Sequence, residues 1–528
     1  MSTTTTAASS RTTIVIDPIT RIEGHLKIEA IVEGGVVKEA RSSGTLYRGF
    51  EGILRGRDPR DAQQITQRIC GVCPQAHGTA AALCLDSAFG LAGAIPDNGR
   101  IVRNLLLGAN YIQSHVLHFY HLAALDYVDV AAAAGYEGTD PDLASVADFV
   151  RRGELAPFVP RYEGDYRLPA ELNRAATAHY VQALTMRRKA HEMLAIFGGK
   201  MPHSVGVVPG GATVEPTVDR IAAFLWRLNE LRHFIDNVYV PDVLAVAGAY
   251  PDYFGIGRGC GRYLSYGVFD LDGAEPSYVD RRRFLPAGTT DAGLDVSPVR
   301  AERITEHVRH SWYADAATGL NPAMGRTEPD RDKPGAYSWL KAPRYDGRAH
   351  EVGPLARVLV AYAAGDPAVR KTVDGVLAHS GAGPDALFSV LGRHAARALE
   401  CKLTADAMAE WVLGLKPGQP TYVEHALPES ASGVGLVDAA RGALGHWIDV
   451  REGRIANYQC VVPTTWNASP RGDDGEPGPI EQAIEGTRIR DQGNPFEIVR
   501  IVRSFDPCTA CAVHLVTPRG RSLGAFHV

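Results

Sequence analysis

Two cysteine pairs, one near each end of the chain, constrain its fold more than any other feature of the sequence. Cys70 and Cys73 lie in RICGVCPQAH, Cys508 and Cys511 lie in DPCTACAVH, and a histidine follows each pair. Cys73 and Cys508 are 435 positions apart, whereas the two pairs of a zinc ribbon are usually roughly 15–20 residues apart. If the four thiolates bind one metal, the fold has to bring the two ends of the chain together.

Spacing alone leaves the identity of such a site open. Four thiolates form a soft ligand set that suits nickel, iron, zinc or copper(I). A thioredoxin-like dithiol needs only one pair, and the cysteines of an iron–sulfur cluster are usually grouped more closely. The eight cysteines are too few for a disulfide scaffold in 528 residues. A metal site is therefore the first interpretation, and a zinc or dithiol protein is the alternative.

Composition and charge exclude several classes of partner. Hydrophobic residues make up 45% of the chain and charged residues 22%, as in a globular protein with a large core. A formal net charge of -5 gives no bulk attraction to nucleic acid or anionic membranes. No apolar run approaches the ~20 residues that cross a bilayer, and the polar start MSTTTTAASSRTT lacks the apolar core of a secretory signal. We therefore expect no nucleic-acid partner, no membrane span, a disordered tail over residues 1–13, and a cytoplasmic location with membrane association only through partners.

Hydrophobic periodicity predicts an α+β fold that is predominantly helical. Alternating apolar and polar residues predict strands over 12–40, with a hairpin at Gly34 and Gly35. The same reasoning predicts strands over 434–450 and 453–466 that return across a site. These strand regions are expected at the periphery of the molecule.

Long helical patterns predict a core built as a bundle of long helices. They lie at residues 98–128, 171–197, 216–248 and 384–415. Asp58 and Pro59 predict the N-cap and first residue of a helix that leads into the first cysteine pair. A further helix is expected over 494–505, before the second pair. Residues 260–350, rich in Gly, Pro and Asp, predict an irregular excursion of strands and loops.

Four further segments accompany the cysteine pairs: PITRIEGHL, YRGFEGILRGRDPRDAQQITQRICGVC, ARGALGHW and NYQCVVPTTWN. Together and in this order they resemble the large subunit of a nickel–iron hydrogenase, and the similarity extends from about Asp17 to His514. In detail the chain is most similar to the oxygen-resistant uptake enzymes of actinobacteria. The resemblance implies heterolytic oxidation of dihydrogen to protons and electrons. A hydrogen-sensing regulatory subunit is the alternative, whereas the related quinone-site subunit of respiratory complex I lacks the cysteine ligands.

The resemblance also implies how the four thiolates are used. Cys70 and Cys508 would be terminal nickel ligands, and Cys73 and Cys511 would bridge nickel to iron. The iron would carry one carbon monoxide and two cyanide ligands. Four thiolates suit both metals because sulfur is a soft donor.

A second metal site and a processing step follow from the same resemblance. Glu51, His514 and the backbone carbonyl of Cys460 would hold a magnesium ion near the C-terminal end. Magnesium prefers oxygen ligands, so another divalent ion is the alternative. Residues 515–528, LVTPRGRSLGAFHV, resemble an extension that a C-terminal endopeptidase removes after nickel insertion. The catalytic domain would then span residues 14–514.

Five further residues match positions with a role in the family. Glu23, in TRIEGH, would take the proton from a terminal cysteine; without the resemblance it would be an exposed strand carboxylate. Arg441 would lie over the open metal position, where a guanidinium donates in a fixed fork. Asp506 would orient Arg441 by a charge-assisted hydrogen bond. His77 would donate to a bridging sulfur and Thr464 to a cyanide.

The chain departs from the family at two positions around Arg441. Many relatives have an aspartate at the position of Ser114 and a proline at the position of Ala440, so both changes alter the surroundings of the gas-binding position. The same segment carries His115, His118 and His121 at helical spacing. We interpret this row as packing and polar contacts between helices rather than as a metal ligand set.

The chain has no motif that would carry electrons away. Its other cysteines, Cys84, Cys260, Cys401 and Cys460, are scattered, and no G-x-G-x-x-G follows a strand. The resemblance therefore implies an iron–sulfur small subunit, in a heterodimer or a dimer of heterodimers. His203, in FGGKMPHS, matches a segment near the first cluster of that partner. A maturation chaperone would act with the endopeptidase.

Overall fold

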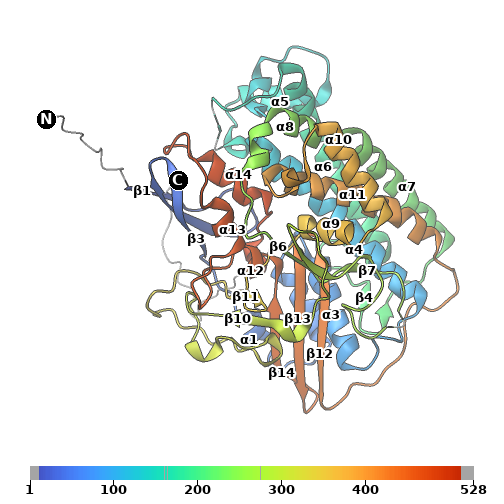
Figure 1. Ribbon diagram of the computed structural model, residues 1–528. Helices are drawn as coiled ribbons and strands as arrows, with labels where there is room; N and C mark the ends of the chain where they lie inside the picture. Colours follow the sequence, from blue (N-terminus) through green and yellow to red (C-terminus); the bar gives the residue numbers. More distant parts are fainter. Residues whose placement is uncertain (1–10, 160, 163, 274, 513–528) are drawn as a thin grey trace.

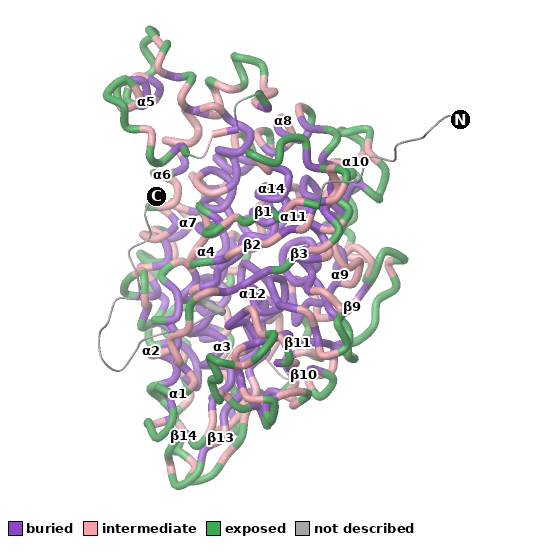
Figure 2. Tube along the Cα trace, turned by 90° about the vertical axis from the view of Figure 1, so that its left-hand side faces the viewer, coloured by how far each residue is buried: buried purple, intermediate pink, exposed green. Residues whose placement is uncertain are grey.

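Helices fill one side of the molecule, and strands gather on the other side and at the base (Figure 1). The computed structural model describes residues 11–159, 161–162, 164–273 and 275–512, and for Cys511 and Ala512 it describes the backbone only. The prediction of a predominantly helical α+β fold is confirmed. Buried residues run through the centre of the chain trace, and exposed residues lie at loops and hairpin tips (Figure 2).

The longest helices pack against one another. They are α4 (Asp97–Leu117), α6 (Ala170–Gly198), α7 (Val218–Phe234) and α11 (Val390–Leu413). Helix α4 contacts α6 and α11, and α7 contacts the same two helices. Every residue of α4 from Val102 onward is buried, as expected for a helix with neighbours on all sides. No helix in the described chain is long and apolar enough to span a membrane.

Two of the long helical patterns contain a turn that the sequence did not reveal. Helix α4 continues into a π-helical turn, His118–Ala123, and α7 into another, Ile235–Tyr239, before α8 (Val240–Ala249). Periodicity still indicates a helix, because the segments on either side of each wider turn keep the helical pattern. The first of these turns places His118 in the interior.

The N-terminal strands form the predicted hairpin and lie beside the C-terminal segment. Strands β1 (Arg11–Ile16), β2 (Leu26–Glu33) and β3 (Val36–Gly44) are antiparallel in that order. Gly34 and Gly35 have φ of 60° and 76°, the left-handed values that a two-residue hairpin requires. Arg11 already pairs with Glu33, so residues 11–13, which were expected in the tail, belong to β1. The backbone N–H of Val37 donates to Thr487 at 2.9 Å, which joins the two ends of the chain.

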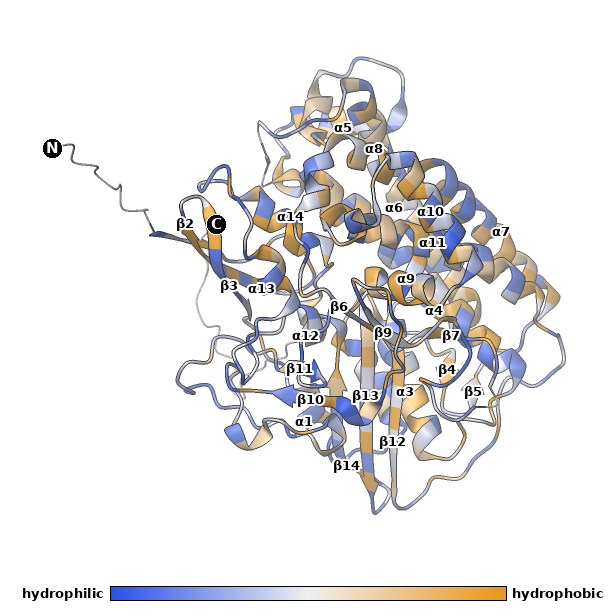
Figure 3. Cartoon of the chain, viewed as in Figure 1, coloured by the Kyte–Doolittle hydropathy of each residue, from blue (hydrophilic) through white to orange (hydrophobic). Residues whose placement is uncertain are grey.

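The inner ends of the strands in a second antiparallel sheet are buried, whereas the sequence predicted these strands at the periphery. The sheet consists of β12 (Ala431–Ala439), β13 (Gly442–Arg451) and β14 (Arg454–Val461). Residues 442–448 are all buried, and the apolar colouring of β12 and β13 in Figure 3 agrees. Helix α3 (Pro74–Ala88) packs against β12 because Gly435 has no side chain. A Cβ there would lie 2.3 Å from the Ala80 carbonyl oxygen.

Residues 260–350 form the irregular excursion that the sequence predicts. Its short strands pair as β6 with β9, β7 with β8 and β10 with β11. Their bounds are β6 (Arg262–Ser265), β7 (Val268–Asp270), β8 (Arg283–Leu285), β9 (Gly288–Asp291), β10 (Ile304–His307) and β11 (Ala342–Tyr345). Other elements are β4 (Val207–Val208), β5 (Gly211–Ala212), α1 (Phe50–Leu54), α5 (Pro141–Arg151), α9 (Pro354–Ala363), α10 (Pro367–Ser380) and α13 (Pro479–Ile484).

Short helices lead to both cysteine pairs. Helix α2 (Asp61–Thr66) begins later than predicted, because the Asp58 carboxylate accepts the backbone N–H of Arg60 at 2.9 Å and forms a turn first. Helix α14 (Phe496–Ser504) precedes the second pair, as predicted, and α15 (Thr509–Ala512) follows Cys508 and contains Cys511. The strand predicted over 453–466 ends early: Pro463 cannot donate to a ladder and instead begins α12 (Pro463–Asn467).

Candidate metal centre

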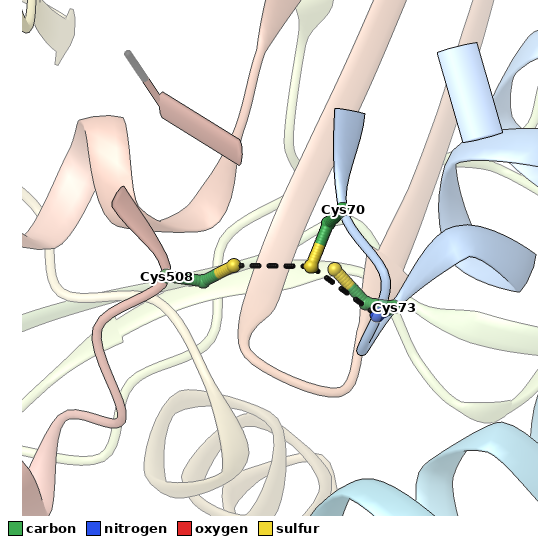
Figure 4. A group of neighbouring side chains, drawn as sticks. All are labelled: Cys70, Cys73 and Cys508. Atoms are coloured by element: carbon green, nitrogen blue, oxygen red, sulfur yellow. Dashed lines mark hydrogen bonds between the residues drawn. The ribbon is translucent and has the colours of Figure 1, made fainter. Parts of the chain in front are cut away.

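Three of the four predicted thiols meet in the interior (Figure 4). The sulfur atoms of Cys70, Cys73 and Cys508 all lie within 4.8 Å of one another, and all three residues are buried. The Sγ atoms of Cys70 and Cys508 are 3.4 Å apart, well beyond the ~2.05 Å of a disulfide. Cys511 follows in α15, but its side chain lies outside the described part of the chain. The two ends of the chain therefore meet, as predicted.

Local backbone geometry directs the first pair inward. A 3-10 turn, Gln67–Ile69, ends at Cys70, whose backbone is extended, with φ of -146° and ψ of 140°. The backbone N–H groups of Val72 and Cys73 then point at the Cys70 sulfur, at 3.2 and 3.5 Å. Cys73 is the N-cap of α3, and Pro74 supplies the first helical residue. The start of α3 thus holds the sulfur atoms of Cys70 and Cys73 close to each other.

Thr464 lies beside the second pair. Its hydroxyl oxygen accepts the backbone N–H of Cys508 at 2.8 Å, and the residue is buried in α12. A hydroxyl that accepts one hydrogen bond still has its own O–H to donate. The structure thus places a hydroxyl donor next to the cysteine cluster, in a segment that the sequence predicted as strand.

The segment that carries Glu23 lies directly against Cys508. Glu23 and Cys508 form an isolated parallel β-bridge, and the backbone N–H of Thr509 donates to the Glu23 carbonyl at 2.7 Å. Gly24 allows this approach, since a Cβ at that position would lie 2.3 Å from the Thr509 hydroxyl. Glu23 is half-buried and is therefore not an exposed strand carboxylate.

Arg441 crosses from the β12–β13 turn to the second cysteine segment. Its Nε donates to the Asp506 carbonyl at 3.0 Å, its Nη2 to the Asp506 carboxylate at 2.9 Å and its Nη1 to the Ser114 hydroxyl at 3.3 Å. Burial disfavours the charged guanidinium, but Asp506 and the cysteine thiolates outweigh burial and hold the pKa of Arg441 well above its ordinary value. Ala440 precedes it and accepts from Arg357 Nη2 at 2.8 Å through its carbonyl. The site thus contains a fixed, buried positive charge.

His77 belongs to a buried chain of three polar side chains. Its Nδ1 lies 3.3 Å from Nε2 of His446, and Nδ1 of His446 lies 2.8 Å from the Tyr458 hydroxyl. Burial, together with the neighbouring His77, holds the pKa of His446 well below its ordinary value. The sequence did not indicate His446 and Tyr458, because only the pairing of β13 with β14 and the packing of α3 against β13 bring them to His77. The expected bond from His77 to sulfur stays a prediction.

A second cluster of charged groups surrounds Glu51. The Glu51 carboxylate accepts the backbone N–H of Cys460 at 2.9 Å and the hydroxyl of Thr327. Glu51 lines a small cavity together with Glu306 and Lys341, which form a buried ion pair at 2.8 Å. Burial opposes the charge of Lys341, but Glu306 and Glu51 outweigh it and raise the pKa of the amine. Glu306 and Lys341 carry no local sequence signal, and His514 lies outside the described residues.

The histidine row has the structural role that was expected. The Nε2 atoms of His115, His118 and His121 bond to the Glu400 carboxylate at 2.9 Å, the Arg503 carbonyl at 2.6 Å and the Tyr180 carbonyl at 3.2 Å. The three residues therefore hold neighbouring helices together and form no ligand set with one another.

Known proteins resemble this chain along nearly its whole length. The family described as nickel-dependent hydrogenase matches residues 48–514, and the HoxL-like family matches residues 13–43. The periplasmic [NiFeSe] hydrogenase large subunit of Desulfomicrobium baculatum is 43% identical over 97% of this chain and 96% of its own. The uptake hydrogenase large subunit of Rhizobium leguminosarum bv. viciae is 39% identical over 98% and 97%. The reduced Ni-Fe-Se hydrogenase of D. vulgaris Hildenborough superimposes with a TM-score of 0.84 at 45% identity, covering 96% of this chain and all of that one.

Proposed function

Because the chain belongs to the nickel-dependent hydrogenase family, we propose that it is the large, catalytic subunit of a [NiFe] hydrogenase that oxidises dihydrogen. Its relatives are named as large subunits of uptake, quinone-reactive and hydrogenase-2 enzymes. The observation that carries the proposal is the buried cluster of Cys70, Cys73 and Cys508, contributed by both ends of the chain. A sensor, zinc or dithiol function has no comparable support.

The donor set fits a nickel–iron centre. Three buried thiols at mutual distances up to 4.8 Å form a soft, preorganised sulfur site. Cys70, Cys73, Cys508 and Cys511 would hold nickel, and Cys73 and Cys511 would also hold an iron with carbon monoxide and cyanide ligands. When bound, such a centre supplies the Lewis acidity that polarises dihydrogen. Some relatives contain selenium by name, whereas this chain has cysteine at all four paired positions.

The residues around the cluster have complementary tasks. Glu23 accepts the proton, since its backbone pairs with that of Cys508. Arg441 provides a permanent positive charge and hydrogen-bond donors, and Asp506 orients it through two contacts. Thr464 has a hydroxyl proton left to donate to a cyanide. Ser114 holds Arg441 through a neutral hydroxyl, where many relatives would have a second carboxylate.

We assign a divalent ion, magnesium in the first instance, to the cavity beside Glu51. A carboxylate and the Cys460 carbonyl are oxygen donors of the kind that magnesium prefers, and His514 would complete the set. Glu306 and Lys341 line the same cavity and would hold water molecules of the ion in place. The ion would tie the mature C-terminus to helix α1, which carries Glu51.

Partners and processing complete the proposal. An iron–sulfur small subunit would receive the electrons, as the large-subunit relatives imply. Residues 14–514 would form the catalytic domain, and a chaperone and an endopeptidase would act on the extension over 515–528. One relative is named as periplasmic, so the expected cytoplasmic location stays a prediction.

Metal analysis with infrared spectroscopy tests this function. The purified complex should contain nickel and iron and absorb where carbon monoxide and cyanide on iron absorb and proteins do not. Cys508→Ser should lose nickel and activity, because a hydroxyl poorly replaces a thiolate. Cys84→Ser is the matched control: this thiol is also buried but is not part of the cysteine cluster and donates to the Gly433 carbonyl, so the metal should stay. Normal nickel content in Cys508→Ser would refute the assignment.

A further inference from the structure

Arg503 joins the second cysteine segment to the turn that carries Glu23. It lies in α14, which leads to Cys508, and is 2% exposed. Its Nε and Nη2 both donate to the Thr20 carbonyl, at 3.0 and 2.9 Å, and Nη2 also donates to the Thr20 hydroxyl at 3.0 Å. One guanidinium edge therefore grips residue 20 at two oxygen atoms.

The opposite edge of Arg503 is fixed by a buried acid. Its Nη1 donates to the Asp126 carboxylate and, at 2.6 Å, to the Tyr162 hydroxyl. Arg21 donates to the same Asp126 oxygen at 2.6 Å, so this carboxylate lies between two guanidinium groups. Asp126 is 1% exposed, and despite burial the two arginines hold its pKa below the usual value.

The turn of residues 20–24 is thus attached to the second cysteine segment at both ends. Arg503 and Asp126 hold its beginning, and the Thr509 backbone N–H holds its end through the Glu23 carbonyl. Within the turn, Arg21 has a φ of 55° and Gly24 a φ of 88°, so the chain adopts left-handed values that an unattached segment would readily leave.

We propose that Arg503 and Asp126 are positioning residues that keep the Glu23 carboxylate within reach of the Cys508 sulfur. The inference rests on the proposed role of Glu23. Proton transfer needs donor and acceptor within about 3 Å or bridged by one water, and a misplacement of about 1 Å can slow a reaction about 100-fold. The contacts of Arg503 with Thr20 hold the start of the Glu23 turn from outside the metal site.

A purely structural role for a buried ion pair is the competing explanation, and the chain offers a matched control for it. Arg500 lies one turn earlier on α14 and is equally buried. It bonds Asp165, the Tyr253 hydroxyl at 2.9 Å and the backbone carbonyl of Asp126, but within the described chain it donates no hydrogen bond to residues 20–24 or to the Asp126 carboxylate. If Arg503 only stabilises the fold, changing either arginine should have the same effects.

The test compares Arg503→Lys with Arg500→Lys in the purified heterodimer. Lysine keeps the charge but cannot grip two oxygens with a planar fork. Arg503→Lys should keep its nickel and its KM for dihydrogen, lower kcat about tenfold, and enlarge the solvent deuterium isotope effect. Backbone amide exchange in the 505–512 peptide should also accelerate about tenfold, because the Thr509 N–H loses its fixed acceptor. Arg500→Lys should show the wild-type isotope effect and the wild-type exchange in that peptide.

Two outcomes would overturn the proposal: wild-type exchange and isotope effect in Arg503→Lys, or the same shifts in Arg500→Lys. If Arg503→Lys does not acquire nickel, Arg21→Lys tests the same turn and should shift both readouts in the same direction by a smaller factor. Unchanged readouts in that variant would also overturn it. Glu23→Gln distinguishes failure of the proposed proton acceptor from failure of the positioning role. A wild-type turnover rate in Glu23→Gln refutes the role of Glu23. Amide exchange in the arginine variants still reports whether Arg503 holds the turn.

Discussion

Arg441 and Glu23 show how much a single residue depends on segments far away in sequence. Arg441 comes from the β12–β13 turn and contacts Asp506, and Glu23 comes from the turn between β1 and β2 and pairs with Cys508. Their motifs identified both residues from the sequence. Glu306, Lys341 and Arg503 were not identified, because each acts through partners far away in sequence and has no motif of its own.

Proton transfer gives the test at this scale. Glu23→Gln keeps the size and the backbone contacts of the residue but cannot accept a proton. We expect turnover to fall by about 100-fold or more, the usual contribution of a general base, while nickel content stays unchanged. Dye reduction under dihydrogen and metal analysis measure both quantities.

Glu33→Gln is the matched control, because this carboxylate lies at the exposed end of β2 and pairs only weakly with Arg11 at 3.6 Å. It should turn over at the wild-type rate. A wild-type rate in Glu23→Gln would mean that another group takes the proton.

At the scale of elements, the helical patterns were predictable and the interruptions were not. Four long amphipathic or apolar windows became α4, α6, α7 with α8, and α11. The π-helical turns and the burial of β13 depend on tertiary contacts that no local window contains, whereas the late start of α2 follows from the local turn at Asp58. Strands read as peripheral became interior because Gly435 admits α3 against the sheet.

The packing of α11 against the end of α4 predicts a pH dependence of stability. His394 of α11 stacks on His118 with ring centroids 5.5 Å apart and is 3% exposed. Burial, reinforced by Arg397, lowers the pKa of His394 to about 3. An unfolded histidine has a pKa of about 6.5, so between these values the unfolded state binds the extra proton. Stability therefore falls as pH decreases through this window, by about 1.4 kcal/mol per pH unit for this residue.

His394→Phe keeps the stacked ring and removes the titration. The melting temperature of the heterodimer, followed by calorimetry from pH 7 to pH 5, should fall less steeply than in the wild type. His379→Phe, at an exposed position of α10, serves as the control and should keep the wild-type slope. Equal slopes in His394→Phe and the wild type would contradict the assignment of a buried neutral imidazole.

For the whole molecule, the sequence predicted that the two ends meet, because two distant thiol pairs can bind one metal only if the fold brings them together. It did not predict how the 260–350 excursion folds. Its described strands are three or four residues long, and they pair with one another or take part in isolated bridges. Such short strands contain too few residues for a hydrophobic period to be recognised. That excursion nevertheless supplies Glu306 and Lys341 to the cavity beside Glu51.

Processing is the first prediction for the whole molecule. Intact-mass analysis of the active protein should find a chain that ends at His514, since the last fourteen residues resemble a removable extension. Protein made without nickel should keep Val528, because removal is expected only after the metal is inserted. An active, nickel-loaded chain that still carries Val528 would contradict this interpretation.

The second prediction for the whole molecule is that the chain depends on a partner subunit. Oxidation of dihydrogen releases two electrons, and the sequence has no iron–sulfur motif to carry them. Expressed with its maturation factors but without the small subunit, the chain should not sustain dye reduction under dihydrogen. The heterodimer purified in parallel is the positive control. Comparable turnover by the isolated chain would show that electrons leave by another route.

The hydrogen bonds that join the N-terminal sheet to residues 487–489 have a consequence for the newborn protein. A ribosome adds about 5–20 residues per second, so roughly 20–90 seconds pass between the synthesis of Cys73 and that of Cys508. Throughout that interval the first thiol pair and the Glu23 turn exist without the segment that encloses them. The nascent chain therefore needs protection from stray metals and oxidants during translation, and a factor that shields its first hundred residues would serve this protein before any nickel arrives.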